Sequence, residues 1–432
     1  MPPHFTVLIG GRTSKVAARG RMSRLGCSRV PKNNLCMQQD DQVTHFARTN
    51  YRTERLFGIR RGDRRAHMYM IGKTGTGKST LLRTLVLQDI QNGEGLGLLD
   101  PHGDLVKEIL EAIPESQKCN VIYFNVPDTA HALSFNPLAD VPPLKRPLVA
   151  AGLLEIFAKI WSDAWGPRLE HVLRNTLLAL LDQPGATLAD VLRMFDDGEF
   201  RTAVIAHVTN HQVRRFWLQE YARYAPGFRS GVIAPIQNKI GAFLADPVLN
   251  RILTQPKSDI NLRQLMDEGK ILLINLAKGE IGESPAALLG ALLVAQIGFA
   301  GLSRANVPET ERRDFYLYMD EFQTFATLNL ATLLSELRKY RVNLILANQY
   351  LSQVDRQVED AILGNVGTLI TFRVGPRDAD FLAKEFSGQF KASDLMNLPN
   401  YNLYLRLMIN GAVSPPFSAR TLNRIEAACI LS

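Results

Sequence analysis

The feature that most constrains the fold of this chain is the segment MYMIGKTGTGKST, which runs from Met68 to Thr80. It joins an apolar run to a glycine-rich turn and then to a helix-like run, with the spacing G-x-x-x-x-G-K-S/T. Glycines let backbone N–H groups close around phosphate oxygens, and the start of a helix adds partial positive charge. The segment therefore predicts a phosphate-binding loop between a strand and a helix, in preference to a chance glycine turn.

The chemistry of such a loop gives its polar residues expected roles. Lys78 is expected to reach the β- and γ-phosphates of ATP, and the Ser79 hydroxyl to bind Mg²⁺. ATP and Mg²⁺ are therefore the predicted cofactors. The residues expected to contact the nucleotide are Gly72, Lys73, Thr74, Gly75, Thr76, Gly77, Lys78, Ser79 and Thr80.

A phosphate-binding loop needs an acidic partner, and the segment FYLYMDEF supplies one at the end of an apolar run. Asp320 is expected to hold Mg²⁺ through its waters, and Glu321 to polarise the attacking water as general base. Such a base favours hydrolysis of ATP over phosphoryl transfer to a small molecule. Gln349 ends another apolar run, NLILANQ, and is a candidate γ-phosphate sensor. The alternative for Gln349 is a surface amide that caps the next helix.

Short apolar runs recur along the chain and predict a buried, mostly parallel sheet. Most are continuously apolar rather than alternating, as strands are when helices cover both faces of a sheet. Runs with helical spacing lie between several of them, so the expected fold class is α/β. The apolar runs occupy residues 68–72, 95–100, 121–125, 271–277, 315–321, 343–349, 368–374 and 401–409.

Between about residues 146 and 262 the pattern changes to helices alone. In PRLEHVLRNTLLALL the apolar residues recur at spacings of three and four, and Pro167 suits a first helical turn. The run GVIAPIQNKIGAFL is also expected to be helical, with Pro235 kinking or starting it. The predicted order is a flexible basic arm (1–44), a first part of the core (45–145), an all-helical insertion (146–262), a second part of the core (263–412) and a C-terminal tail (413–432).

The charge of the chain is concentrated at its start. Of its 50 Lys and Arg and 42 Asp and Glu residues, 14 and 4 respectively lie in residues 1–66, so the remainder is slightly acidic. The pI of about 9.3 therefore describes a basic arm rather than the body of the protein. Such an arm can bind polyanions, but a solvated tail or a mistaken start site is the favoured interpretation.

Two further classes of protein are disfavoured by the sequence. Four cysteines lie far apart with no Cys-x-x-Cys pair, which argues against a disulfide framework and fits a reducing cytoplasm. A metal knuckle of Cys27, Cys36 and His45 is a weak alternative. Residues 285–302 are uncharged over nearly the length that spans a bilayer, but Gln296 interrupts them. We expect a buried helix there and no integral membrane segment.

Taken together, these motifs resemble those of the HerA/FtsK-like ATPases, and most of all the soluble ATPase part of TraG/TraD-type conjugative coupling proteins, which serve DNA transfer in type IV secretion. The resemblance covers about residues 45–425 and implies a RecA-like P-loop NTPase core, with an inserted all-helical domain, in hexameric rings that thread DNA. It rests on GKTGTGKST, LLDPHGD, WGPRLEHVLRN, GVIAPIQNKIGAFL, YMDEFQTF and RKYRVNLILANQ, in this order.

The resemblance implies the same roles for the loop, the acidic pair and Gln349, and it adds an arginine. Arg338 matches the arginine that the family supplies to a neighbouring subunit's ATP, where a guanidinium stabilises transition-state charge. Lys339 and Arg341 are alternatives for that role, an ordinary exposed arginine is another reading of Arg338, and Arg373 is a further candidate for γ-phosphate contact. The chain departs from its relatives at Arg341, where they often have glycine, and in lacking their common transmembrane helices.

The stretch GLLDPHGDL, from Gly97 to Leu105, places carboxylates beside a histidine. A zinc site would need further His or Cys ligands close by. Asp100 is expected at the carboxyl end of a strand, and the resemblance gives this position an acidic residue near the ATP site. We therefore expect Asp100 to orient water at the Mg²⁺ site or the attacking water. His102 and Asp104 are expected to be turn and helix-capping residues.

The expected function is an ATP-hydrolysing, ring-shaped DNA translocase. The alternatives are a secretion-system ATPase that acts on protein and a HerA-like scaffold for a partner nuclease; an ABC-type ATPase is disfavoured because no LSGGQ-like signature is present. Arg229, Lys239 and Lys278 are candidates for sequence-independent DNA contact in the pore. The expected partners are DNA, further copies of the chain, and a relaxase, nuclease or secretion-channel protein. The expected location is the cytoplasm, with peripheral attachment to the inner face of the membrane left open.

Overall fold

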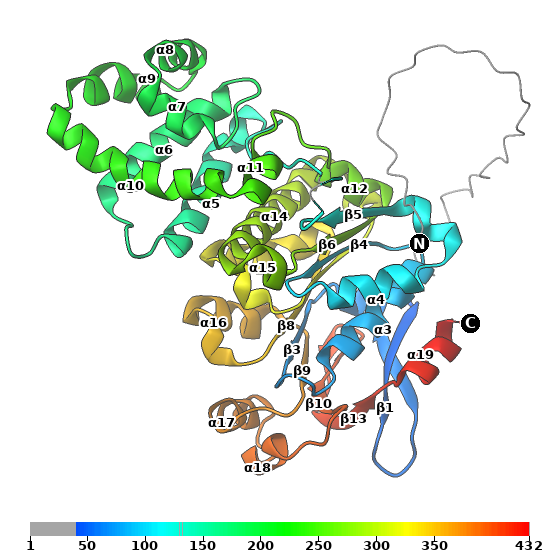
Figure 1. The fold of residues 1–432 in the computed structure, drawn as a ribbon. Helices are drawn as coiled ribbons and strands as arrows, with labels where there is room; N and C mark the ends of the chain where they lie inside the picture. The colour runs from blue at the N-terminus through cyan, green and yellow to red at the C-terminus, as the bar shows by residue number, and fades with distance from the viewer. Residues whose placement is uncertain (1–39, 129, 132, 432) are drawn as a thin grey trace, which may run out of the picture.

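The computed structural model describes residues 40–431, except residues 129 and 132. Its centre is one sheet of eleven strands in the order β2-β1-β13-β10-β9-β3-β8-β7-β4-β6-β5 (Figure 1). Residues 1–39, which hold most of the predicted arm and both Cys27 and Cys36, lie outside the described residues. The predictions of a basic arm and of a metal knuckle therefore stay predictions.

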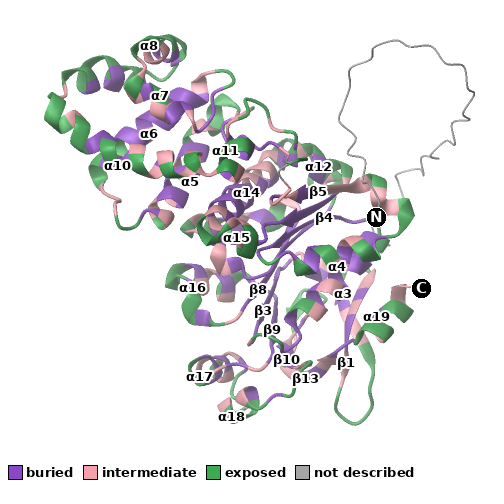
Figure 2. Ribbon diagram, viewed as in Figure 1, coloured by how far each residue is buried: buried purple, intermediate pink, exposed green. Residues whose placement is uncertain are grey.

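Seven neighbouring strands of this sheet, from β9 to β5, pair in parallel. All but the edge strand β5 are buried along their whole length, as Figure 2 shows for the centre of the sheet. This burial explains the continuously apolar runs, and it confirms the predicted α/β fold with a mostly parallel sheet. The strands are β9 (Thr368–Thr371), β3 (Met68–Ile71), β8 (Val342–Asn348), β7 (Phe315–Met319), β4 (Gly95–Asp100), β6 (Ile271–Asn275) and β5 (Val121–Asn125).

Helices cover both faces of the parallel strands. Because successive side chains of a strand point to opposite faces, Met70 packs with the helices of one face and Tyr69 with those of the other. The first face carries α3 (Lys78–Gln91) and α4 (Asp104–Ala112), and the second carries α12 (Leu262–Glu268), α14 (Glu283–Ser303) and α15 (Leu328–Glu336).

Four antiparallel strands extend the sheet beyond β9: β10 (Asn402–Arg406), β13 (Phe417–Thr421), β1 (Val43–Thr49) and β2 (Leu56–Arg60). The prediction that residues 413–432 form a C-terminal tail is wrong, because β13 lies inside the sheet between β1 and β10. Only two of its five residues are buried, so β13 gives no apolar run in the sequence. The same segment ends in α19 (Arg424–Leu431).

The stretch 146–262 is fully described and contains helices without strands. These helices form a unit beyond one end of the sheet (Figure 1). Pro167 begins α6, as predicted, whereas Pro235 stands inside α10 rather than at its start. The helices are α5 (Arg146–Ile160), α6 (Pro167–Asp182), α7 (Asp190–Asp196), α8 (Gly198–His207), α9 (His211–Arg215), α10 (Pro226–Ala245) and α11 (Pro247–Leu253), with short turns at Phe216–Glu220 and Tyr221–Arg223.

The long apolar helix α14 lies between this helical unit and the sheet. Within the described residues, Glu283–Asn306 is the one helical span long and apolar enough to cross a membrane, and 67% of its apolar window is buried inside the protein. A Cβ at Gly290 would lie 2.2 Å from the Phe325 ring, and Gln296 donates a hydrogen bond to the Pro137 carbonyl. This close packing agrees with the prediction of a buried helix.

The remaining elements are short. They are α2 (Arg61–Arg64), α13 (Lys278–Ile281), α16 (Arg356–Asn365), α17 (Pro376–Glu385), α18 (Ala392–Met396), the hairpin of β11 (Met408–Ile409) and β12 (Ala412–Val413), and 3-10 turns at Glu115–Asn120, Pro143–Lys145, Arg304–Asn306, Glu309–Glu311, Phe322–Thr324, Leu337–Tyr340 and Leu351–Gln353.

His67 ties three elements together at the amino end of β3. Its Nδ1 accepts a hydrogen bond from the Leu344 N–H of β8, and its Nε2 lies 3.0 Å from the Leu334 carbonyl of α15. One ring nitrogen therefore accepts and the other donates, which is the neutral imidazole. Burial, with a smaller contribution from the Arg338 charge, lowers the pKa of His67 to about 4.

This histidine makes stability depend on pH. The folded-state pKa lies below the ordinary value of about 6.5, so the contribution of neutral His67 is complete above pH 6.5 and is lost as the pH falls towards 4. We expect about 2 kcal/mol of this contribution to be lost between pH 7.5 and 5. Urea unfolding at both pH values should show a smaller loss in His67→Asn, which tolerates the positive φ of this position. Equal losses in both proteins would contradict the assignment.

Candidate nucleotide site

The glycine-rich loop joins the carboxyl end of β3 to the start of α3. Gly75 and Gly77 have φ of 75° and 123°, in a region where side chains are strained. A Cβ at Gly77 would also lie 3.1 Å from ring atoms of both Phe372 and Tyr401. Glycine at position 77 is thus required both by the backbone conformation and by the side chains packed behind the loop.

Lys78 folds over the loop that precedes it. Its side chain is 6% exposed, and its ammonium donates to the carbonyl oxygens of Gly72 at 2.5 Å and Lys73 at 3.2 Å. Thr76 fastens the same turn by donating to the Lys73 carbonyl. Of the other loop residues, Gly72, Thr76 and Gly77 are buried, Lys73 and Thr80 half-buried, and Thr74, Gly75 and Ser79 exposed.

Asp320 follows β7 and lies beside the start of α3, where its Oδ2 is 3.4 Å from the Ser79 hydroxyl. Burial, followed by the charges of Asp100 and Glu321, raises the pKa of Asp320 to about 6, which Lys78 only partly opposes. Three carboxylates thus share one ammonium, and a divalent cation would relieve this excess of negative charge.

The oxygens of Ser79 and Asp320 fit Mg²⁺, which keeps several waters and takes one or two carboxylates together with substrate phosphates. Within the described residues, no cluster of three or more His, Cys, Asp or Glu side chains could hold a metal alone. The residues present therefore fit a metal that arrives with a nucleotide.

Glu321 is held by two glutamine side chains. Gln349, which follows β8, donates to one carboxylate oxygen at 2.6 Å, and Gln323 donates to the other at 2.8 Å. The backbone of Glu321 adopts a left-handed conformation, φ 48°, and its N–H donates to Asp320. The structure thus joins the predicted base to the predicted sensor, and adds Gln323. Gln323 lies in the DEFQTF motif, two residues after Glu321. The turn that brings its side chain back to Glu321 cannot be predicted from the sequence.

Asp100 caps the start of α4, a role that the sequence predicts for Asp104. Its two carboxylate oxygens accept hydrogen bonds from the backbone N–H groups of His102 and Val106, at the start of α4. Asp104, the expected cap, begins the helix but makes no side-chain capping bond. The capping prediction for Asp104 is wrong, because Gly103 turns the chain so that α4 begins over Asp100. Asp100 remains near enough to Asp320 to raise its pKa.

Arg338 is not brought to the nucleotide site of its own chain. It is exposed in the turn Leu337–Tyr340, which precedes β8, and its charge acts on His67 at the amino end of β3. The glycine-rich loop and Gln349 lie at the other end of these strands. The seven residues of β8 span roughly 20 Å, so Arg338 and the loop stand at opposite edges of the sheet.

The two alternatives to Arg338 are engaged in local contacts. Lys339 lies 3.3 Å from Glu336 in the same turn. Arg341 faces Asp314 at 3.7 Å and has a φ of 59°. Glycine adopts this left-handed conformation at lower cost than arginine does.

The flank of the loop on the side of β9 is built from two further segments. The Lys73 N–H donates to the Arg373 carbonyl, and the Arg373 guanidinium donates to Asn400 at 2.9 Å. The Tyr401 N–H donates to the Thr76 carbonyl at 2.7 Å. Tyr401 was not found by sequence reasoning, since a tyrosine between a turn and a strand carries no recognisable pattern.

The helical unit contacts the segment that follows Glu321. Lys159, near the end of α5, donates to the carbonyl oxygens of Gln323 at 3.1 Å and Ala326 at 2.6 Å. Since the Gln323 side chain holds Glu321, one residue connects the helical unit to the expected general base.

Two of the candidate DNA-contacting residues, Arg229 and Lys239, lie on α10, and the third, Lys278, lies on α13. Arg229 of α10 donates to the Tyr221 carbonyl, Lys239 pairs with Asp163 at 2.9 Å, and Lys278 begins α13 after β6. Their contact with DNA stays a prediction.

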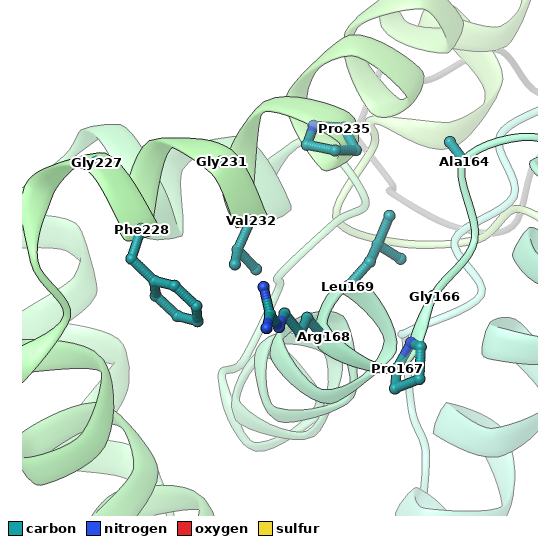
Figure 3. A pocket seen from close by; sticks show the side chains of 10 residues that line it. All are labelled: Ala164, Gly166, Pro167, Arg168, Leu169, Gly227, Phe228, Gly231, Val232 and Pro235. Atoms are coloured by element: carbon teal, nitrogen blue, oxygen red, sulfur yellow. The ribbon is translucent and has the colours of Figure 1, made fainter.

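A hollow of about 570 Å³ opens between the start of α6 and the first half of α10 (Figure 3). Arg168 and Phe228 face one another there, with the guanidinium 5.4 Å from the ring centroid. Because the hollow lies wholly in the helical unit, it is separate from the glycine-rich loop.

Comparison with known proteins agrees with this geometry. A model of the type IV secretion-system coupling protein DNA-binding domain family matches residues 57–397. The chain belongs to this family. No curated protein matches the chain by sequence.

Solved structures of the coupling protein TrwB share the fold of this family member. An unbound form is 15% identical with a TM-score of 0.62 and covers 90% of this chain and 91% of its own. A complex of TrwB with the ATP analogue ADPNP is 16% identical with a TM-score of 0.62, over 91% and 94%. VirB4 of Thermoanaerobacter pseudethanolicus is 14% identical with a TM-score of 0.57, over 89% and 98%. At these identities the likeness shows the fold.

Proposed function

We propose that this coupling-protein family member is an ATPase that drives DNA transfer, working as a ring of identical subunits. The observation that carries the proposal is the convergence of the glycine-rich loop and five side chains at one edge of the sheet. The glycine-rich loop, Lys78, Ser79 with Asp320, and the Glu321–Gln349 pair all follow the carboxyl ends of parallel strands, where α/β proteins bind ligands. TrwB, which shares the fold, has been solved with ADP and Mg²⁺ and with ADPNP.

The chain's own residues divide the work of hydrolysis. The backbone N–H groups of the loop and the Lys78 ammonium bind the phosphates, and Ser79 and Asp320 hold the metal. When bound, Mg²⁺ would neutralise the charge that develops on the phosphate oxygens. Glu321 accepts the proton of the attacking water, and its bonds from Gln323 and Gln349 fix where that carboxylate points. Gln349, which follows β8 and donates to Glu321, would report the γ-phosphate to β8.

Assembly completes the site under this proposal. Arg338 is too far from its own loop to act there, so its guanidinium serves the ATP of a neighbouring subunit. Hydrolysis then depends on the presence of a neighbour. A hexameric ring is the assembly that we propose, in agreement with the sequence expectation.

DNA is the proposed substrate of the motor because the matched family is described as a DNA-binding domain of coupling proteins. Lys159 offers a route by which the helical unit influences Glu321. We propose a cytoplasmic location at the secretion channel, with a relaxase or channel protein as further partner.

The proposal is tested by the ATPase rate of a sample of known oligomeric state with single-stranded DNA, duplex DNA and no DNA. A rate that rises several-fold with either DNA form is the expected result. A rate that DNA leaves unchanged would contradict a DNA motor and point to a secretion ATPase that acts on protein. Transfer that persists in Glu321→Gln while assembly is intact would instead indicate a scaffold.

A further inference from the structure

We propose that Tyr401 forms a stacking surface for the base of the bound nucleotide, on the flank of the glycine-rich loop opposite Glu321. The inference rests on the proposed nucleotide site. It adds the chemical class that this flank recognises, which is a planar nucleobase bound by stacking without hydrogen-bond selection.

Tyr401 is fixed against the loop from two sides. Its N–H donates to the Thr76 carbonyl at 2.7 Å, and its carbonyl accepts from the Thr421 N–H of β13 at 2.8 Å. Its ring lies beside Gly77, since a Cβ built there would be 3.1 Å from Tyr401 Cδ1. The aromatic ring is therefore positioned at the junction where the loop becomes α3.

The ring is nevertheless left in solvent. Tyr401 is 51% exposed, and its φ of 67° is a conformation that asparagine or glycine adopts at lower cost. Neither burial nor backbone preference accounts for a tyrosine at this position. An exposed aromatic face beside a phosphate-binding loop is suited to a flat partner.

The order of strands places this ring at the nucleoside end of the ligand. β3 lies between β8 and β9. Glu321 and Gln349 follow β7 and β8, so the γ-phosphate faces that side of the loop. Tyr401 precedes β10, which pairs with β9 on the other side. A nucleotide whose terminal phosphate faces Glu321 therefore directs its base away from Glu321, towards the flank that carries Tyr401.

Stacking on a side chain tolerates any base, because every base has a π-face. Adenine and guanine nucleotides should therefore depend on Tyr401 to the same extent. The phosphate chain alone should not depend on it.

The test compares three ligands in the presence of Mg²⁺ by titration calorimetry on the full chain: AMPPNP, GMPPNP and tripolyphosphate. Tyr401→Asn removes the ring and keeps a residue that tolerates the positive φ. We expect it to weaken AMPPNP and GMPPNP about tenfold and to leave tripolyphosphate unchanged. Tyr401→Phe keeps the stacking face and should bind all three as the parent protein does.

Each other outcome has a distinct meaning. If Tyr401→Asn weakens tripolyphosphate binding equally, Tyr401 only supports the loop. If AMPPNP binding is unchanged in this variant, there is no base subsite at Tyr401. Either result overturns the inference and leaves the assignment of the nucleotide site intact. A parent protein that binds none of the three ligands would instead overturn the proposed function, and the inference with it.

Discussion

Replacement of Lys78 by alanine is expected to abolish ATP turnover. The Lys78 ammonium is the positive charge that opposes the rise in the pKa of Asp320, and it already lies on the loop that would hold the phosphates. Removing it leaves Mg²⁺ alone to balance the phosphate charge and three carboxylates at the site. We expect the rate to fall by about 10²-fold or more, in line with the loss of a charge-stabilising donor.

The matched control is Lys107→Ala, because Lys107 is an exposed lysine on the neighbouring helix α4, 3.9 Å from Glu280. Its turnover should equal that of the parent protein. Thermal unfolding of both variants separates loss of chemistry from loss of fold, since Lys78 also ties the loop to itself. Unchanged turnover in a folded Lys78→Ala protein would refute the assignment of the nucleotide site.

Replacement of Arg338 by alanine is expected to leave nucleotide binding intact and to lower hydrolysis by about 10³-fold or more. The reason is its place at the amino edge of the sheet, beside His67 rather than beside its own loop. Glu321→Gln should be inactive for the opposite reason, since it retains Arg338 and lacks the base. Assemblies that mix the two variants should regain activity, because one kind of interface then pairs an intact base with an intact arginine.

Lys339→Ala is the control for this experiment, since Lys339 is the next residue and its side chain forms an exposed pair with Glu336. It should hydrolyse ATP normally. If assemblies shown to contain both variants stay inactive, Arg338 does not act across the interface.

The sequence was sufficient to predict those elements that have a recognisable local pattern of residues. The glycine-rich loop follows from its residue spacing. The strands that lead to Asp320 and Gln349 and the buried helix over residues 285–302 follow from continuous apolar runs, which burial on all sides produces. It was insufficient for β13, whose half-buried, polar residues are held by pairing with β1 and β10 rather than by their own composition.

The contacts of the nucleotide site that the sequence did not predict are also set by how distant segments meet. Asp100 was found, but its capping of α4 depends on the turn at Gly103, and the sequence assigned that role to Asp104. Lys159 acts through backbone carbonyls, Gln323 reaches the Glu321 side chain across a left-handed turn, and Tyr401 contacts the loop through its own N–H. No spacing rule in a single sequence encodes such contacts.

The separation of Arg338 from the glycine-rich loop restricts the symmetry that an assembly can have. If each chain offers its arginine from one edge of the sheet and receives one at the other, the two surfaces of the contact are different. A two-fold dimer presents the same surface from both partners, so it would leave these surfaces unmatched. Head-to-tail contact instead either closes into a ring or continues as a filament, and the rotation between successive subunits decides which. The size of the ring is thus a property of one interface angle, and a substitution that alters this angle would change the number of subunits while leaving every active site complete.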